Sequence, residues 1–154
     1  MAAGQGLCLV GAAVVYTAVA HIEATPDEIF DVLVGFDEYA DWNPWLIQAE
    51  GEAVVGDSVT ATVVLGDSTR TARHRVLEVD APNRLCWRDA GVTTWFVKGR
   101  RCRIVEAEGA GGFLRNELQI WGLFAWLANK KYGDALLEGI SAETAAVKAR
   151  AEGR

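Results

Sequence analysis

Residues 21–33 read HIEATPDEIFDVL and contain the sharpest boundary between two structural elements in this sequence. The β-branched run before it, residues 14–22, predicts a strand. Thr25 then supplies a helix N-cap, and Pro26 is followed by two acidic residues, as is typical of a first helical turn. Apolar side chains recur at helical spacing through residues 29–34. We therefore expect a strand followed directly by a helix that begins at Pro26.

A second short helix is predicted over residues 37–41, and the pattern then changes to β-rich runs. Between residues 46 and 121 turn signals rich in Gly, Asp and Asn separate six such runs. Because no helical segment lies between them, antiparallel pairing is expected. Residues 123–150 contain no proline and predict one long closing helix, in which Gly133 and Gly139 are candidate positions for a kink.

These elements predict an α+β fold with a curved seven-stranded antiparallel sheet wrapped around one long C-terminal helix, and two short helices after the first strand. One helix cannot fill a strongly curved sheet, so a gap suited to a small molecule is expected between them. The length of 154 residues, with 51% hydrophobic residues, fits a single domain. We assign residues 14–150 to this domain, residues 1–13 to a leader and residues 151–154 to a tail.

Charge and cysteine content exclude several classes of partner. Fifteen Lys and Arg against 21 Asp and Glu give a net charge of -6, which argues against a nucleic-acid partner. The apolar run at residues 7–20 lacks a basic flank and is shorter than a bilayer span, so stable membrane insertion is not expected. Cys8, Cys86 and Cys102 form no CxxC pair and are expected to be isolated thiols, which predicts a cytoplasmic protein without a metal or a cofactor.

Five stretches of the sequence are similar to one known family. Residues 21–33 resemble its opening strand-to-helix signature, and FDEYADWNP at residues 36–44 resembles its second helix with the trailing Trp-Asn-Pro. PNRLCW at residues 82–87, the Gly-Gly pair at residues 111–112 and the start of the closing helix at residues 122–124 resemble its later parts. The family is the START-like superfamily, also called SRPBCC, and within it the bacterial polyketide cyclase/dehydrase and lipid-transport-like group. The resemblance implies the helix-grip fold.

The sequence departs from the family pattern at residues 99–103, GRRCR, where a histidine often precedes an aromatic residue. Chemistry assigned to that histidine is therefore not implied for this chain. The family contains lipid and hormone binders, cyclases, dehydratases and co-chaperone-like modules. The resemblance alone does not choose between a carrier and an enzyme.

Six tryptophans are many for this length, and an indole suits either the wall of an apolar pocket or an ordinary core. Trp42 and Trp45 are favoured as pocket residues because they flank a proline-containing loop between helix and sheet. Aromatic and apolar side chains, together with one arginine, make up the predicted ligand-binding set: Trp42, Trp45, Trp87, Trp95, Arg101, Leu118, Ile120, Trp121 and Leu127.

Three residues are candidate acids or bases. His74 lies in the middle of a predicted strand and either faces the gap, where it could carry a proton, or is exposed among arginines. Glu117 either pairs with Arg101 or Arg103 across strands at a pocket wall or forms an ordinary surface pair. Tyr132 on the closing helix could donate a hydrogen bond to a ligand oxygen.

The sequence therefore predicts a protein that binds a small hydrophobic or aromatic molecule, such as a lipid, a polyketide-like ring system or an isoprenoid, between sheet and helix. The alternative is a cofactor-independent cyclase or dehydratase that uses general acid–base residues in that gap. A third possibility is a protein-interaction module with a filled interior and an apolar surface patch. Oligomeric state is left open.

Overall fold

The computed structural model describes residues 4–10 and 13–153. The predicted leader and tail therefore lie partly outside the described residues; within them, a strand occupies residues 4–10 and the last helix continues to residue 152. The elements, in chain order, are β1 (Gly4–Val10), β2 (Ala13–Ile22), α1 (Pro26–Val34), η1 (Phe36–Glu38), α2 (Tyr39–Trp42), β3 (Leu46–Glu50), β4 (Ser58–Leu65), β5 (Ser68–Asp80), β6 (Arg84–Ala90), η2 (Val92–Trp95), β7 (Lys98–Glu108), β8 (Gly111–Trp121) and α3 (Ala125–Glu152).

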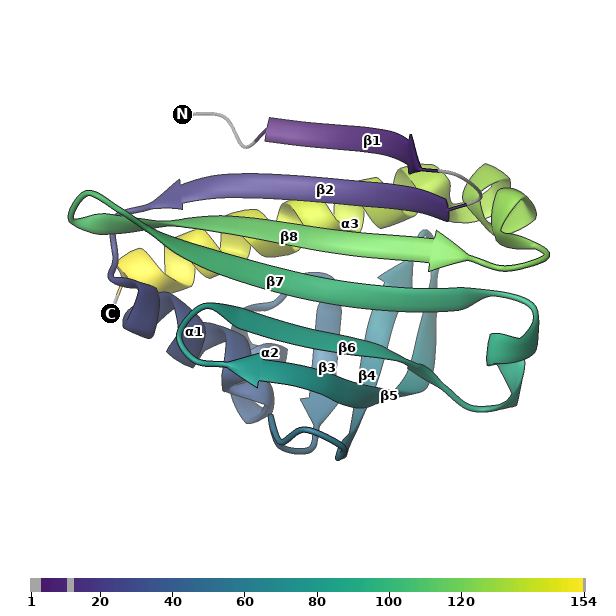
Figure 1. Cartoon of the computed structure of the whole chain (residues 1–154), viewed down its shortest axis with the longest axis horizontal. Helices are drawn as coiled ribbons and strands as arrows, with labels where there is room; N and C mark the ends of the chain where they lie inside the picture. Colours follow the sequence, from purple (N-terminus) through teal and green to yellow (C-terminus); the bar gives the residue numbers. More distant parts are fainter. Residues whose placement is uncertain (1–3, 11–12, 154) are drawn as a thin grey trace.

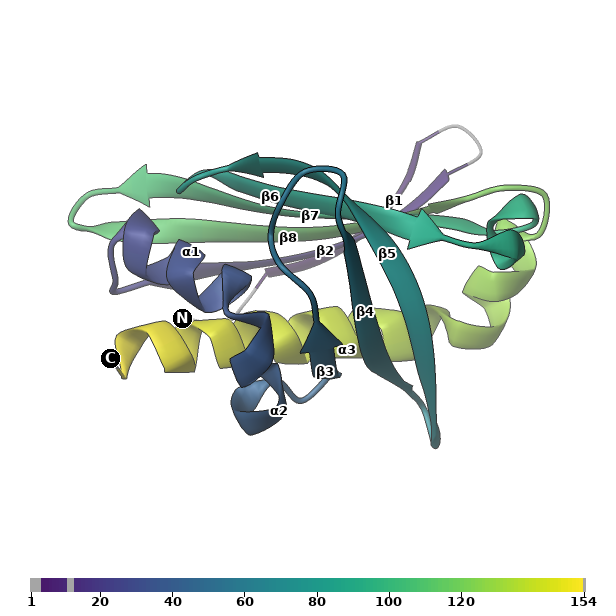
Figure 2. The same ribbon diagram turned by 90° about the horizontal axis from the view of Figure 1, so that it is seen from below.

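All strands belong to one antiparallel sheet with the order β1-β2-β8-β7-β6-β5-β4-β3. Strands β2 to β8 are the seven that the sequence predicts, and β1 extends the sheet at the β2 edge. The sheet curls so that β3, β4 and β5 wrap toward α3, which lies across the concave face (Figures 1 and 2). The predicted helix-grip architecture is confirmed.

The boundary between β2 and α1 follows the sequence signals closely. The Thr25 side chain accepts a hydrogen bond from the backbone N–H of Glu28, and the Glu28 carboxylate accepts one from the backbone N–H of Thr25. This capping box satisfies two backbone donors that a helix start leaves free. The helix begins at Pro26, as predicted.

Helix α3 approaches the sheet closely at its two internal glycines and continues through both of them. A Cβ at Gly139 would lie 2.3 Å from the Trp45 indole nitrogen, so only glycine lets this ring lie against the helix backbone. A Cβ at Gly133 would lie 3.3 Å from the hydroxyl of Tyr16, which donates a hydrogen bond to Asn129. The glycines therefore serve contact with the sheet. Within the described residues, no helix is long and apolar enough to cross a membrane.

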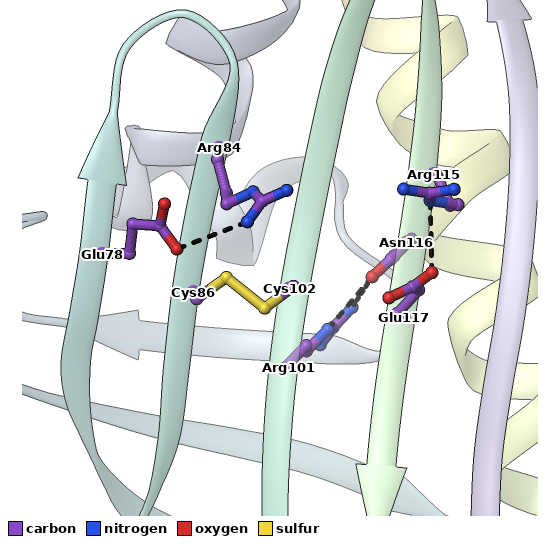
Figure 3. Close-up of a disulfide and its surroundings, with 8 residues drawn as sticks. All are labelled: Glu78, Arg84, Cys86, Arg101, Cys102, Arg115, Asn116 and Glu117. Atoms are coloured by element: carbon purple, nitrogen blue, oxygen red, sulfur yellow. Dashed lines mark hydrogen bonds and ion pairs between the residues drawn. A yellow bond between two sulfur atoms is a disulfide. The ribbon is translucent and has the colours of Figure 1, made fainter. Parts of the chain in front are cut away.

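Cys86 and Cys102 form a disulfide between neighbouring strands, so the prediction of isolated thiols is wrong for these two residues (Figure 3). The two cysteines are direct partners in the register of β6 and β7, with a Cα–Cα distance of 4.2 Å. A spacing of 16 residues carries no pairing signal until that register is known. The side chain of Cys8 lies outside the described part of the chain.

Alkaline pH is expected to destabilise the protein through Tyr39. Its side chain is fully buried and donates a hydrogen bond to the backbone oxygen of Leu33. Burial raises the pKa of Tyr39, although the charges of Arg103 and Arg101 act in the opposite direction. The unfolded chain therefore ionises first, so stability is full below about pH 10 and is lost as the pH rises from there toward the folded pKa.

Urea unfolding between pH 8 and pH 11 measures this effect. Tyr39→Phe is expected to be less stable at pH 8, because it lacks the hydrogen bond, but to lose less stability than wild type above pH 10. The free energy of unfolding of Tyr39→Phe is still expected to fall somewhat as the pH rises, because the pKa of Tyr16 is also raised, by burial and by the negative charge of Asp134. If the free energy of unfolding fell equally with pH in the wild type and in Tyr39→Phe, Tyr39 would be excluded as the cause of the alkaline destabilisation.

Candidate functional site

A cavity of about 670 Å³ lies between the concave face of the sheet and α3. Its walls come from β3 to β8, from η2 and the residues after it, and from the first half of α3. Most of its surface is apolar. Five of the predicted ligand-binding residues line it: Trp45, Trp87, Arg101, Leu118 and Ile120.

The other four predicted ligand-binding residues do not line the cavity. Trp42 packs beside the main core, with its ring 5.1 Å from that of Tyr39. Trp121 directly follows Ile120 on β8. Because successive side chains of a strand point to opposite faces and Ile120 faces the cavity, Trp121 lies on the outer face. Trp95 and Leu127 are exposed at the end of the cavity formed by η2 and the start of α3.

That end carries an exposed apolar rim. The rings of Phe96 and Phe124 lie 5.6 Å apart, and the Phe124 backbone N–H donates to the Phe96 carbonyl. Val92 and Phe96 also line the cavity, so the rim is continuous with its wall. Neither residue was predicted from the sequence, because the segment offers no periodicity that assigns a face. The rim comprises Val92, Trp95, Phe96, Leu123, Phe124, Trp126 and Leu127.

His74 faces the cavity, so of its two predicted placements the exposed one is wrong. Its Nε2 lies 3.2 Å from Oδ1 of Asp89 on the neighbouring strand, and its ring lies 5.4 Å from that of Trp87. Gly99 makes room for this carboxylate, since a Cβ there would lie 2.6 Å from Oδ2. Tyr132 lines the cavity from α3.

Glu117 lies on the outer face of β8 in a surface ion pair, so of its two predicted placements the pairing with Arg101 or Arg103 at a pocket wall is wrong. Its carboxylate contacts the Arg115 Nε at 3.2 Å, on the same strand. The register places Glu117 opposite Cys102, whereas Arg101 and Arg103 alternate to the concave side. Figure 3 shows Glu117 beside Arg115 while Arg101 reaches Asn116. Glu117 is therefore remote from the cavity.

Arg101 and Arg103 meet instead at Glu143 of α3, a residue that was not among the predicted site residues. All three are almost completely buried. The Arg101 guanidinium contacts Oε2 of Glu143 directly, and Nη2 of Arg103 lies 3.6 Å from Oε1. A signal was available in the sequence, because Glu143 follows the buried Ile140 by three residues and therefore lies on the buried stripe of the helix.

Neutral amides complete the shell around this carboxylate. The side-chain N–H groups of Asn43 and Asn116 each donate to Glu143 at 2.8 Å. The side-chain oxygen Oδ1 of Asn43 accepts hydrogen bonds from the backbone N–H groups of Trp45 and Leu46, which fixes the loop between α2 and β3. Asn43 thus supports the turn and also donates to the buried carboxylate of Glu143.

Each buried arginine also stacks on a tryptophan of the cavity wall. The Arg101 guanidinium carbon lies 4.5 Å from the centre of the Trp45 ring, and that of Arg103 lies 4.1 Å from the centre of the Trp87 ring. Burial, with repulsion from Arg103, lowers the pKa of Arg101 well below its usual value. Burial also lowers the pKa of Arg103. Both pKa values are lowered because burial removes the two guanidinium groups from water, which disfavours their charged forms.

No group of three or more His, Cys, Asp or Glu side chains among the described residues could hold a metal ion. What the cavity offers is an apolar volume, one buried cation at its wall and further polar side chains, among them those of His74, Asp89 and Tyr132.

Solved structures of similar shape share little sequence with this chain. The Zhui aromatase/cyclase from Streptomyces sp. R1128 superposes with a TM-score of 0.79 at 17% identity, over 92% of this chain and 95% of that one. Protein Ms6760 from Mycobacterium smegmatis gives a TM-score of 0.76 at 15% identity, over 95% and 94%. The di-domain ARO/CYC StfQ from the steffimycin biosynthetic pathway gives 0.74 at 13% identity; this chain spans 51% of it. These likenesses show the fold.

A search of the curated protein sequences finds no significant match. A family model, in contrast, matches residues 13–152, from the first residue of β2 to the last residue of α3. Its description is polyketide cyclase / dehydrase and lipid transport. The chain therefore belongs to the polyketide cyclase / dehydrase and lipid transport family.

Proposed function

We propose that this protein binds a small hydrophobic or aromatic molecule, such as a lipid, a polyketide-like ring system or an isoprenoid, in the cavity between sheet and α3. The observation that carries the proposal is the volume of about 670 Å³ behind mostly apolar walls. Pockets for small molecules typically measure about 300–1,000 Å³ and combine apolar walls with a few polar groups.

Burial alone supplies useful affinity in such a cavity. Removing about 200 Å² of apolar ligand surface from water contributes about 5 kcal/mol before ordering costs. One or two polar anchors then suffice for specificity. A pure protein-interaction module, which would need a filled interior, fits this cavity poorly.

The proposed partner is the small molecule alone, with neither nucleic acid nor stable membrane insertion. A cytoplasmic location also remains a proposal from the sequence. Disulfides are rare in reducing compartments, so in the cytoplasm the Cys86–Cys102 bond is expected to be open.

Nile red, a neutral apolar dye, tests the cavity through a variant that fills it. Ala72 lines the cavity from β5, opposite Ala61 of β4, so Ala72→Trp places an indole in the ligand volume. We expect the dye to bind the wild type and to bind Ala72→Trp at least about tenfold more weakly, which corresponds to about 1.4 kcal/mol of lost binding free energy.

Arg73→Trp is the matched control, because Arg73 is the next residue on the same strand and is exposed on the outer face. It is expected to bind the dye as the wild type does. Equal dye affinity in Ala72→Trp and wild type, or no binding to either, would contradict the proposed site.

A further inference from the structure

The cavity carries a local excess of positive charge in an acidic protein. The chain has a net charge of -6. Around the cavity, however, Arg70 and Arg101 line the wall and Arg103 lies directly behind it. They are opposed by Asp89, which is partly exposed, and by the buried Glu143. Three arginines therefore face two carboxylates around the ligand volume.

The excess of positive charge is concentrated at the most deeply buried part of the cavity wall. Arg101, Arg103 and Glu143 are all at most 3% exposed, so a single negative charge is shared by two cations. Glu143 contacts Arg101 more closely than Arg103, and no described residue accepts a hydrogen bond from the Arg103 guanidinium. Charges act over longer distances in such an interior than in water, so this site retains an uncompensated positive potential.

Of the two buried arginines, Arg101 is the one whose side chain lines the cavity and can contact a ligand. Its Nη2 contacts Glu143, and Nε and Nη2 lie 3.3 and 3.4 Å from the Asn116 side-chain oxygen. Its other terminal nitrogen, Nη1, donates to no described residue. The side chain lines the cavity, stacked on Trp45, so a donor of fixed orientation is available beside apolar walls.

We propose that the cavity selects organic anions, namely molecules with an apolar body and one negatively charged oxygen group, a carboxylate or an acidic enol or phenol, held next to Arg101. The apolar body is the ligand of the proposed function, on which this inference rests. The anion balances the second buried arginine, which Glu143 leaves without full compensation. A neutral ligand of equal shape would leave that charge unbalanced.

The test compares two probes of similar shape and different charge, 2-naphthoate and 2-naphthalenemethanol, by their displacement of Nile red at neutral pH. We expect the carboxylate to bind the wild type about tenfold or more tightly than the alcohol, because charge-assisted hydrogen bonds are the stronger kind. Dye that binds but is displaced equally by both probes would overturn the charge preference and leave the proposed cavity intact. Failure of the dye to bind would count against the cavity itself.

Arg101→Met tests the placement of the anion. The substitution leaves Arg103 and Glu143 as one cation and one anion, so no buried carboxylate is left without a partner. In Arg101→Met, the affinity for 2-naphthoate is expected to exceed the affinity for 2-naphthalenemethanol by less than about twofold. Arg101→Lys, which keeps the charge, is expected to retain part of the preference, and a thermal melt checks that both variants fold.

Arg100→Met is the matched control, since Arg100 is the preceding residue of β7 and is exposed on the outer face. It is expected to keep the wild-type ratio. A ratio that survives in Arg101→Met but is lost in Arg70→Met would overturn the assignment to Arg101 and place the anion at the outer end of the cavity.

Discussion

Glu143→Gln is expected to lower the free energy of unfolding by about 3–5 kcal/mol, a larger loss than that expected for any other single substitution proposed for this protein. Glutamine has nearly the same shape but only one acceptor oxygen, so it keeps the hydrogen bond from Asn43 or the one from Asn116 and turns its own N–H groups toward the other. It removes the only negative charge in contact with Arg101 and Arg103 among the described residues. Two buried cations without a counter-charge are far more costly than a missing surface pair.

Urea unfolding measures this loss, with Glu138→Gln as the control on the exposed side of the same helix. The control is expected to change stability by less than about 0.5 kcal/mol. Replacing the whole set, Arg101→Met with Arg103→Met and Glu143→Leu, is expected to cost less than Glu143→Gln alone, because no buried charge then remains. A loss below about 1 kcal/mol for Glu143→Gln would show that the cluster is not held by its charges.

Opening the Cys86–Cys102 disulfide is expected to lower stability by about 3 kcal/mol, the value for a loop of about 15 residues in the chain-entropy description. The bond joins the central strands β6 and β7 at a separation of 16 residues. Cys102 directly follows Arg101 of the cavity wall on β7, so the open form is also expected to bind Nile red more weakly.

Unfolding curves with and without a phosphine reductant provide the measurement. The double variant Cys86→Ala/Cys102→Ala is the matched control, because it should resemble the reduced wild type and should not respond to reductant. An oxidised wild type whose stability equals that of the double variant would mean that the bond contributes nothing.

The elements of the fold could be predicted because each has a local cause. Thr25, Pro26 and Glu28 mark the start of α1 by their own hydrogen bonds and ring geometry, independent of the rest of the chain. Alternation along β8 places Glu117 on the opposite face from Leu118 and Ile120, but it does not say which of the two faces lines the cavity. Such signals depend on residues only a few positions apart.

The parts that could not be predicted depend on register and on which face an element presents. The partner of Arg101 is on α3, about 40 residues away in the chain, and it became evident only once the helix lay across the sheet. The Cys86–Cys102 bond likewise requires the pairing of β6 with β7. Trp95 and Leu127 were assigned to the ligand because they are apolar, but their segments place them on the rim.

The distribution of tryptophans gives the protein a built-in optical read-out. Trp45 and Trp87 are walls of the cavity, buried beneath arginines, whereas Trp95 and Trp126 are 82% and 64% exposed on the rim. A cationic collisional quencher such as caesium reaches the exposed rim indoles and is repelled by the arginines that cover the buried ones. The ultraviolet emission that survives caesium therefore comes mainly from buried indoles, so occupancy can be followed without attaching a label.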